Sequence, residues 1–288
     1  MTDIGAHGPS ALDPILSAAP HRVGIVSLVV ADLDRVSDFY RRMLGLELLE
    51  TSEGVARLGT ASAVLLELRH DAGAAPRSAR DAGLFHTAFL LPERADLGAW
   101  LAFGQGAGLQ LQGAADHTVS EAVYLSDPEG NGIEIYVDRP PEAWPMADGT
   151  VQMANDRLDF PGPADMARAR AWAGFPSGGT IGHVHLQVGD LAPAETFYRG
   201  VLGFDVTCRY TGATFYGSGG YHHQLAANIW NSRGAGPRPE RATGLAEVEL
   251  LVDPATLDAI AARASDAGGP DGRTLRDPWG TAIRLAAS

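Results

Sequence analysis

Residues 24–45 read GIVSLVVADLDRVSDFYRRMLG, and residues 182–203 read GHVHLQVGDLAPAETFYRGVLG. The two stretches align without a gap, and a Phe-Tyr-Arg triplet and a glycine at each end fall at the same positions. An internal repeat on this scale indicates that one structural unit has been duplicated. Two shorter matches extend the repeat, between 83–91 and 244–252 and between 126–136 and 276–286. The chain therefore divides into four units, at about 21–70, 82–138, 180–232 and 243–288.

Each unit carries the same pattern of expected secondary structure. A strand of alternating apolar residues comes first, and Asp32 or Asp190 then offers its side chain as the N-cap of an amphipathic helix. The helix is expected to end at Gly45 or Gly203, since glycine adopts the left-handed conformation that commonly closes a helix. Short segments rich in Val, Leu, Ile and Tyr, separated by turn formers, predict three further strands. The unit is therefore βαβββ, with one sheet face left for a partner unit to cover.

The segments outside the four units are expected to be less regular. Residues 1–20 are typical of a loosely ordered N-terminal arm, and residues 139–180 of a long connector rich in proline and glycine, with one short helix at about 164–172. As domains, we expect the first pair of units to span 21–138 and the second pair to span 181–288. A connector of this length usually has a role, and here it would let units that are not sequence neighbours pair.

Composition sets limits on the function. The 288 residues include 22 basic and 35 acidic side chains, and the net charge of −13 argues against binding to nucleic acid or to anionic membranes. Cys208 is the only cysteine in the sequence, which excludes an intramolecular disulfide and a cysteine-rich zinc site. No apolar run is long enough for a membrane helix and no secretory signal is recognisable, so we expect a cytoplasmic protein.

Four tandem βαβββ units with these strand and turn sequences resemble the vicinal oxygen chelate superfamily. This superfamily includes glyoxalases, type I extradiol dioxygenases and bleomycin- or fosfomycin-resistance proteins. The resemblance covers residues 21–138 and 180–286, which is most of the chain. It implies an α+β fold in which pairs of units form two cupped mixed sheets, with a metal ion bound in a cup.

A sharper motif lies between residues 117 and 134. The residues whose spacing is similar to the signature of type I extradiol ring-cleaving dioxygenases are His117, Val123, Tyr124, Asp127, Pro128, Gly130 and Glu134. Ala115 departs mildly from that signature, which usually has a residue such as Gly or Asn two positions before the histidine. Residues 219–230 (GGYHHQLAANIW) also resemble the equivalent strand of catechol 2,3-dioxygenase-like proteins. The resemblance implies an enzyme of aromatic hydrocarbon catabolism that cleaves a catecholic ring beside its two hydroxyl groups, with O2 as the second substrate.

In this superfamily a cup offers four ligand positions, on the first and last strands of two paired units. In units two and three these positions hold His86, Glu134, His183 and one of His222 or His223. In units one and four they hold Ile25, Glu67, Glu247 and Arg284. Because an arginine cannot bind a divalent cation, we predict that unit two pairs with unit three around the metal. Units one and four would form a second, metal-free cup, in which Arg284 pairs with Glu247 or Glu67.

Two histidines and one carboxylate on one face form the ligand set of non-haem Fe(II) oxygenases. His86, Glu134 and His183 would therefore hold Fe(II), or Mn(II), which accepts the same kind of ligand. His185 lies two residues beyond His183 and so faces the same side of the strand. It is the alternative ligand, or a residue that binds the substrate.

The resemblance also implies catalytic roles for other residues. His223 would be the acid/base residue near the bound oxygen, a task that suits a side chain whose pKa lies near neutrality. His222 faces the opposite way along the strand, and it is the alternative for that role or a substrate-binding residue. Tyr124 would donate a hydrogen bond to a substrate oxygen, and His117 would orient the substrate or control its access.

Two other functions fit the same fold. One is a glyoxalase-like metal-dependent isomerase or lyase, and the other is a resistance-type protein that binds a small aromatic molecule without catalysis. Such isomerases typically use four protein ligands with carboxylates among them, so a histidine at the fourth position favours the oxygenase. A complete ligand set counts against the binding protein. The sequence leaves open which catechol is cleaved and whether the chain forms a homodimer.

Overall fold

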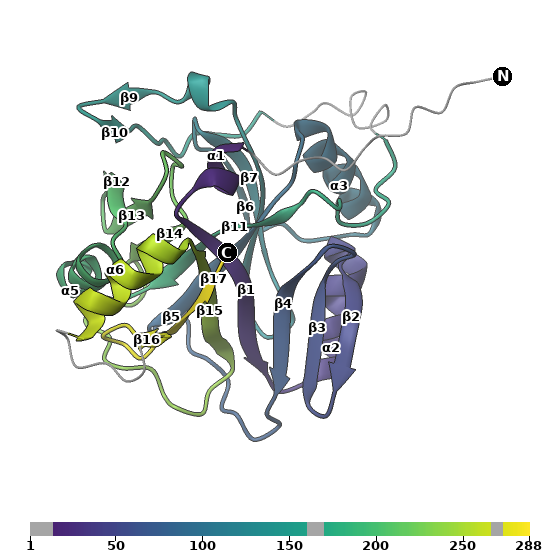
Figure 1. The fold of residues 1–288 in the computed structure, drawn as a ribbon. Helices are drawn as coiled ribbons and strands as arrows, with labels where there is room; N and C mark the ends of the chain where they lie inside the picture. Colours follow the sequence, from purple (N-terminus) through teal and green to yellow (C-terminus); the bar gives the residue numbers. More distant parts are fainter. Residues whose placement is uncertain (1–13, 160–169, 266–272) are drawn as a thin grey trace.

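The computed structural model describes residues 14–159, 170–265 and 273–288. Its strands form two large curled mixed sheets, and helices pack at their sides (Figure 1). The predicted α+β fold with two cupped mixed sheets is therefore confirmed. The helix predicted at about 164–172 lies mostly outside the described residues, and residues 170–172 are not helical.

One sheet has seven strands and is built from units one and four. Its strands in spatial order are β16 (Thr274–Arg276), β17 (Ala282–Ala287), β15 (Gly244–Val252), β1 (His21–Val30), β4 (Ala63–His70), β3 (Val55–Thr60) and β2 (Glu47–Ser52). The two first strands, β1 and β15, pair antiparallel at its centre, and each pairs in parallel with the last strand of its own unit.

The other sheet has eight strands and is built from units two and three. Its strands in spatial order are β12 (Asp205–Tyr210), β13 (Ala213–Gly217), β14 (Leu225–Asn228), β11 (Thr180–Gln187), β5 (Gly83–Leu90), β8 (Gly132–Asp138), β7 (Ser120–Ser126) and β6 (Gly113–Asp116). Here β5 and β11 pair antiparallel at the centre. The sheets thus combine unit two with unit three and unit one with unit four, as the ligand positions predicted. The domain limits of 21–138 and 181–288 stay a prediction.

A helical segment follows the first strand of each unit. These segments are α2 (Leu33–Phe39) with the π-helical turn η1 (Tyr40–Leu44), α3 (Arg94–Gly106), α5 (Leu191–Glu195) with the π-helical turn η3 (Thr196–Val201), and α6 (Pro254–Ser265). Asp32 and Asp190 cap their helices through hydrogen bonds to backbone N–H groups. Gly45 and Gly203 follow the helical turns with φ of 75° and 85°, so the predicted ends are confirmed. The π-helical turns were not predicted.

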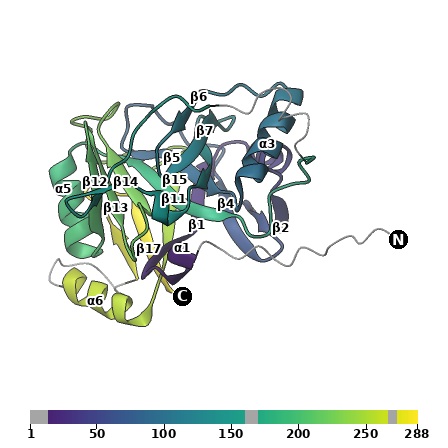
Figure 2. The same cartoon turned by 90° about the horizontal axis from the view of Figure 1, so that it is seen from above.

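One apolar core joins the two sheets. It contains buried residues of β1 and β11, among them Val26 and Val184, and residues from the helix of each unit. Trp100 of α3 is buried in this core and its indole N–H donates to the carbonyl oxygen of Met43 in η1 at 2.8 Å. Figure 2 shows α5 and α6 together on one side of the molecule and α3 on the other. Helices of units one and two therefore pack together, as do those of units three and four.

Two buried tyrosine–aspartate hydrogen bonds connect consecutive units. Tyr40 donates to Asp127 Oδ2 at 3.4 Å, and Tyr198 of unit three donates to Asp277 Oδ2 of unit four at 2.8 Å. The other oxygen of Asp127 accepts the backbone N–H groups of its own turn, including that of Asn131 at 2.9 Å. Burial raises the pKa of Tyr40 and of Tyr198 well above the usual value, which keeps both as donors. The Asp-Pro part of the 117–134 motif thus stabilises the fold.

The segments outside the units are more structured than their sequences indicated. Residues of the arm form a short helix, α1 (Pro14–Ala18), whose Leu16 is buried in a second apolar cluster with Trp144 and Tyr221. The connector contains a 3-10 turn, η2 (Pro141–Ala143), and a small hairpin of β9 (Met146–Ala147) and β10 (Thr150–Val151). Unit four shows two strands after its helix within the described residues, where three were predicted.

No helix of the described chain is long and apolar enough to span a membrane.

Candidate metal centre

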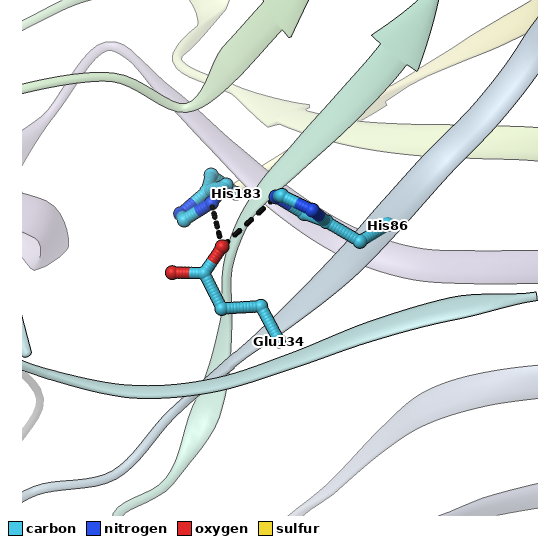
Figure 3. A group of neighbouring side chains, drawn as sticks. All are labelled: His86, Glu134 and His183. Carbon is cyan, nitrogen blue, oxygen red and sulfur yellow. Dashed lines mark hydrogen bonds and ion pairs between the residues drawn. The ribbon is translucent and has the colours of Figure 1, made fainter. Parts of the chain in front are cut away.

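Three neighbouring strands at the centre of the eight-stranded sheet bring three ligand-type side chains together. His86 comes from β5, Glu134 from β8 and His183 from β11, and Figure 3 shows the side chains converging. One nitrogen or oxygen atom from each residue lies within 4.8 Å of the others. All three side chains are buried, and Glu134 is only 2% exposed. An isolated buried carboxylate is costly, so this arrangement needs a compensating positive charge.

The distances within this triad fit a bound cation. Glu134 Oε2 lies 3.3 Å from His183 Nε2 and 2.9 Å from His86 Nε2. The His86 contact lacks hydrogen-bond geometry, so this buried nitrogen has no hydrogen-bond partner. A buried imidazole nitrogen that lacks a hydrogen-bond partner and faces a carboxylate is suited to bind a metal ion. Two imidazoles and one carboxylate suit a divalent transition metal such as Fe(II) or Mn(II).

The electrostatics of Glu134 and His183 favour the forms that bind a metal. Burial alone would raise the pKa of Glu134, but His183 and His86 outweigh it and hold that pKa well below its usual value. Burial lowers the pKa of His183, and Glu134 opposes this shift only in part. The carboxyl group is therefore ionised and the His183 ring is neutral near pH 7, which are the forms that bind metals.

A cavity of about 600 Å³ opens beside the triad and is large enough for a substituted single-ring compound. Its wall includes all three triad residues and four aromatic side chains: Phe85, Tyr210, Phe215 and Trp230. The connector contributes residues 153–155 to the wall. The long connector thus forms part of the cavity wall, whereas its length had predicted a role in the pairing of units.

His223 lines this cavity, whereas His222 does not. The His223 ring lies 4.1 Å from the His183 ring, centroid to centroid. His222 is fully buried behind it, and its Nδ1 lies 2.7 Å from His223 Nδ1. The structure therefore does not place His222 where it could touch a substrate. The prediction that the two side chains leave a strand in opposite directions is wrong, because both residues precede β14 and their rings lie together, 4.6 Å apart between centroids. Burial lowers the pKa of His223 well below its usual value, so its ring is neutral.

His117 and Tyr124 form a pair on the cavity wall. His117 Nδ1 lies 2.9 Å from the carbonyl oxygen of Ala154, so this nitrogen carries a proton and donates it. In a neutral ring Nε2 is then an acceptor, and it receives the Tyr124 hydroxyl at 2.5 Å. Burial raises the pKa of Tyr124 well above its usual value, with a further contribution from Glu134. Tyr124 therefore stays protonated beside the triad.

His185 also lines the cavity but lies outside the triad. Its ring centroid is 4.9 Å from that of His86, and its Nε2 is 3.0 Å from the side-chain nitrogen of Asn228. The amide N–H donates to this ring nitrogen, which occupies the lone pair that a metal would need. Burial lowers the pKa of His185 well below its usual value, and His86 adds to the shift. His185 is thus placed as a neutral wall residue next to the triad.

The corresponding positions of the seven-stranded sheet carry an ion-pair network. It consists of Glu67, Glu247 and Glu249 with Arg57, Arg69 and Arg284. Arg284 contacts Glu247 at 3.1 Å and Glu249 at 3.0 Å, and Arg69 bridges Glu67 and Glu247. The ion pair predicted between Arg284 and Glu247 is confirmed. Glu249, which completes the network, was not predicted.

Other residues around the triad were missed at the sequence level. Asp138 at the end of β8 lies 2.8 Å from His222 Nε2, and Asn228 contacts His185. The aromatic wall residues Phe85 and Trp230 were missed as well. Asp138 and His222 are 84 residues apart, and their contact depends on the pairing of units two and three. A strand aspartate or phenylalanine has no signal of its own in the sequence.

Comparisons with known proteins agree with this arrangement. The sequence pattern of the Glyoxalase/Bleomycin resistance protein/Dioxygenase superfamily matches residues 22–135 and 180–286. The chain is 39% identical over 252 residues to catechol-2,3-dioxygenase of Bacillus subtilis (strain 168), and the match covers 85% of this chain and 88% of that protein.

Two solved structures share the fold at low sequence identity. A crystal structure from Bacillus subtilis subsp. subtilis str. 168 matches with a TM-score of 0.60 at 14% identity, covering 92% of this chain and 85% of the other. Glyoxalase I from Zea mays matches with a TM-score of 0.55 at 17% identity, covering 94% of each chain. The duplicated units, the two sheets and these matches agree, and the chain belongs to the Glyoxalase/Bleomycin resistance protein/Dioxygenase superfamily.

Proposed function

We propose that this protein is an extradiol dioxygenase that cleaves a catecholic ring with O2 at an Fe(II) centre. The observation that carries the proposal is the buried triad of His86, Glu134 and His183, which opens on a cavity of about 600 Å³. Its 39% identity to a protein named catechol-2,3-dioxygenase supports the same reaction class. The fold alone is shared with glyoxalase I and does not distinguish the two activities.

The three triad residues would hold the metal, with Fe(II) favoured and Mn(II) as the alternative. When bound, the metal would supply adjacent open positions for the two catechol oxygens and for O2. The neutral imidazole rings and the ionised carboxylate together leave one positive charge on a divalent ion. That charge would favour binding of a catechol in its deprotonated form.

The other wall residues would bind the substrate and move its protons. His223 is neutral and lines the cavity beside His183, so it can accept a proton from a substrate hydroxyl group. Tyr124 lies beside Glu134 and is fixed by His117, which in turn is fixed by the connector through Ala154. We propose that Tyr124 contacts a substrate oxygen, that His117 orients Tyr124, and that His185 forms part of the wall around the ring.

Metal content and ring cleavage test the proposal directly. The full chain, purified anaerobically without a histidine tag, is analysed for metals before and after loading with Fe(II), and is then given a panel of catechols with O2. We expect about one iron or manganese per chain and a yellow ring-cleavage product. Nickel or zinc at that level, with no cleavage by the iron-loaded chain, would favour the isomerase or lyase. Failure to take up any metal would favour a protein that only binds a small aromatic molecule.

The remaining expectations from the sequence are part of this proposal. A cytoplasmic location fits an enzyme of aromatic hydrocarbon catabolism that acts on a small molecule and O2. Association into a homodimer through sheet edges is a further expectation, which sedimentation of the purified chain would test.

A further inference from the structure

A chain of hydrogen bonds runs from His223 into the protein, away from the cavity. His223 Nδ1 lies 2.7 Å from His222 Nδ1, and His222 Nε2 lies 2.8 Å from Asp138 Oδ1. The second oxygen of Asp138 accepts the hydroxyl of Tyr221 at 2.7 Å. The Tyr221 oxygen in turn lies 2.8 Å from that of Tyr136. Four side chains from two segments, β8 of unit two and residues 221–222 of unit three, thus meet behind a single cavity residue.

The acceptor at the inner end decides which ring nitrogens carry protons. Asp138 is a carboxylate that already accepts one hydroxyl, so His222 Nε2 must be the donor in the contact with Asp138 Oδ1. A neutral His222 then has a bare Nδ1, which can only accept. Because the two Nδ1 atoms lie 2.7 Å apart, His223 must donate from its own Nδ1. His223 Nε2 is left with a lone pair.

The His222 ring is fully buried among other rings, and the centroid distances are 4.2 Å to Tyr221, 5.1 Å to Trp144 and 4.6 Å to His223. Its two ring nitrogens have Asp138 and His223 as their partners. At the other end of the chain, no hydrogen bond to His223 Nε2 is seen among the described residues, and His223 lines the cavity. The unshared lone pair is therefore the one available to a ligand.

We propose that Asp138 and His222 are positioning residues that hold His223 as its Nδ1–H tautomer and so present the Nε2 lone pair to the cavity. The use of that lone pair in turnover rests on the proposed function. There, an O–H bond of the catechol would break as an N–H bond forms at His223 Nε2, and the proton would return to a product oxygen later. The opposite tautomer would present an N–H to the cavity and could not accept this proton.

The tautomers can be measured without any activity. Ring-nitrogen NMR of the full chain with 15N-labelled histidine distinguishes protonated from bare nitrogens. The chain would be measured with Zn(II), which has no unpaired electrons, and again without metal. We expect a protonated Nδ1 and a bare Nε2 on His223, and the reverse on His222. A bare Nδ1 on His223, or a His222 protonated on both nitrogens, would overturn the proposal.

A pair of variants tests the consequence for turnover. His222→Phe removes the acceptor for His223 Nδ1 and places a ring of similar size among the aromatic neighbours. Thr207→Val is the matched control, since the Thr207 hydroxyl donates only to the backbone oxygen of His222 and of Phe215. In His222→Phe we expect a mixture of His223 tautomers and a kcat that is lower by about tenfold, with KM and iron content unchanged. Thr207→Val should match the native chain in all four measurements.

Different results would contradict the proposed function and the positioning of His223. If the native chain has the expected tautomers but cleaves no catechol, the proposed function is wrong while the positioning of His223 stands. If the native chain cleaves catechols and His222→Phe retains the native kcat with a folded circular dichroism spectrum, the positioning role is wrong. A loss of iron from His222→Phe would also contradict it, because that result assigns His222 to the metal site.

Discussion

The two sheets of this protein have the same architecture and opposite chemistry at their centres. In the eight-stranded sheet, His86 and Glu134 stand where Glu247 and Arg284 stand in the seven-stranded sheet, according to the internal repeat. The first pair leaves a buried carboxylate between imidazole rings. In the second pair Arg284 contacts Glu247 directly at 3.1 Å. One cup therefore needs an added cation, and the other contains its own.

This difference shows how a duplicated fold can keep one metal centre and lose the other. Buried carboxylates must be compensated, either by a metal or by a guanidinium group. A guanidinium fork bridges two carboxylates, as Arg284 does with Glu247 and Glu249, and it needs no ion from solution. The seven-stranded sheet then serves as a scaffold whose central strand β1 supports β11 through the shared core.

The largest expected effect comes from removing the carboxylate of the triad. Glu134→Ala should abolish stoichiometric iron binding and all ring cleavage, because two imidazoles alone do not complete the ligand set. The measurement is iron per chain after anaerobic loading, together with the circular dichroism spectrum to confirm folding. Glu247→Gln is the matched control in the other cup and should retain iron. Stoichiometric iron in Glu134→Ala, or its loss in Glu247→Gln, would reverse the assignment of the two cups.

A smaller effect is expected from His223, which lies in the metal cup but outside the triad. His223→Ala should keep iron and catechol binding and lower kcat by about a hundredfold or more, since acid/base assistance is typically worth that much. Steady-state kinetics and elemental analysis measure the two properties separately. The control is Thr207→Val, which removes a hydrogen bond to the backbone oxygen of His222 and leaves the His223–His222 contact in place. Native turnover in His223→Ala would exclude an acid/base role.

The fold and the pairing of units could be predicted because they depend on repeated local patterns. The Asp32 and Asp190 caps and the glycines at 45 and 203 determine helix ends within a few residues, so they are visible without any tertiary contact. The pairing followed from one incompatible side chain, Arg284, at a position where a metal ligand would be required. These are local rules or simple exclusions, and neither needs the geometry of the whole molecule.

The remaining features depend on contacts between distant segments. The distinction between His222 and His223 could be made only as a preference, since the rule of alternating strand residues does not say which side is the cavity, and both residues precede β14. Asp138 approaches His222 only because β8 and β14 belong to one sheet. Likewise, the connector reaches His117 through a backbone oxygen at Ala154, and a backbone acceptor has no residue-type signature.

The cup of the seven-stranded sheet, which contains the ion-pair network, is here called the ion-pair cup. Loss of Arg284 from this cup should lower the stability of the protein and leave its metal content unchanged. Arg284→Met removes both of its ion pairs and leaves Glu249 without a guanidinium partner. We expect unfolding to become easier by about 1–2 kcal/mol, between the values for exposed and buried pairs, with iron content and kcat unchanged. Urea unfolding measures the first quantity. Arg199→Met, which breaks an exposed contact to Glu195, is the control and should change stability little.

The smallest expected effect is a pH dependence that belongs to the ion-pair cup. Burial would raise the pKa of Glu67, but the hydrogen bonds from Arg57 and Arg69 outweigh it and lower that pKa. A carboxyl group with a lowered folded-state pKa contributes stability that is complete above its unfolded value of about 4.3 and is lost as the pH falls through the folded value.

Glu67→Gln should therefore be less stable than the native chain at pH 7, by at most about 1 kcal/mol, because the side chains of its partners Arg57 and Arg69 are 39% and 40% exposed to solvent. The difference should shrink as the pH falls from 5 towards 3, which melting curves of the metal-free chains at several pH values would show. A difference that stays constant across this range would mean that Glu67 acts through packing. The charge balance that distinguishes the two cups would then rest on Glu247 and Glu249 alone.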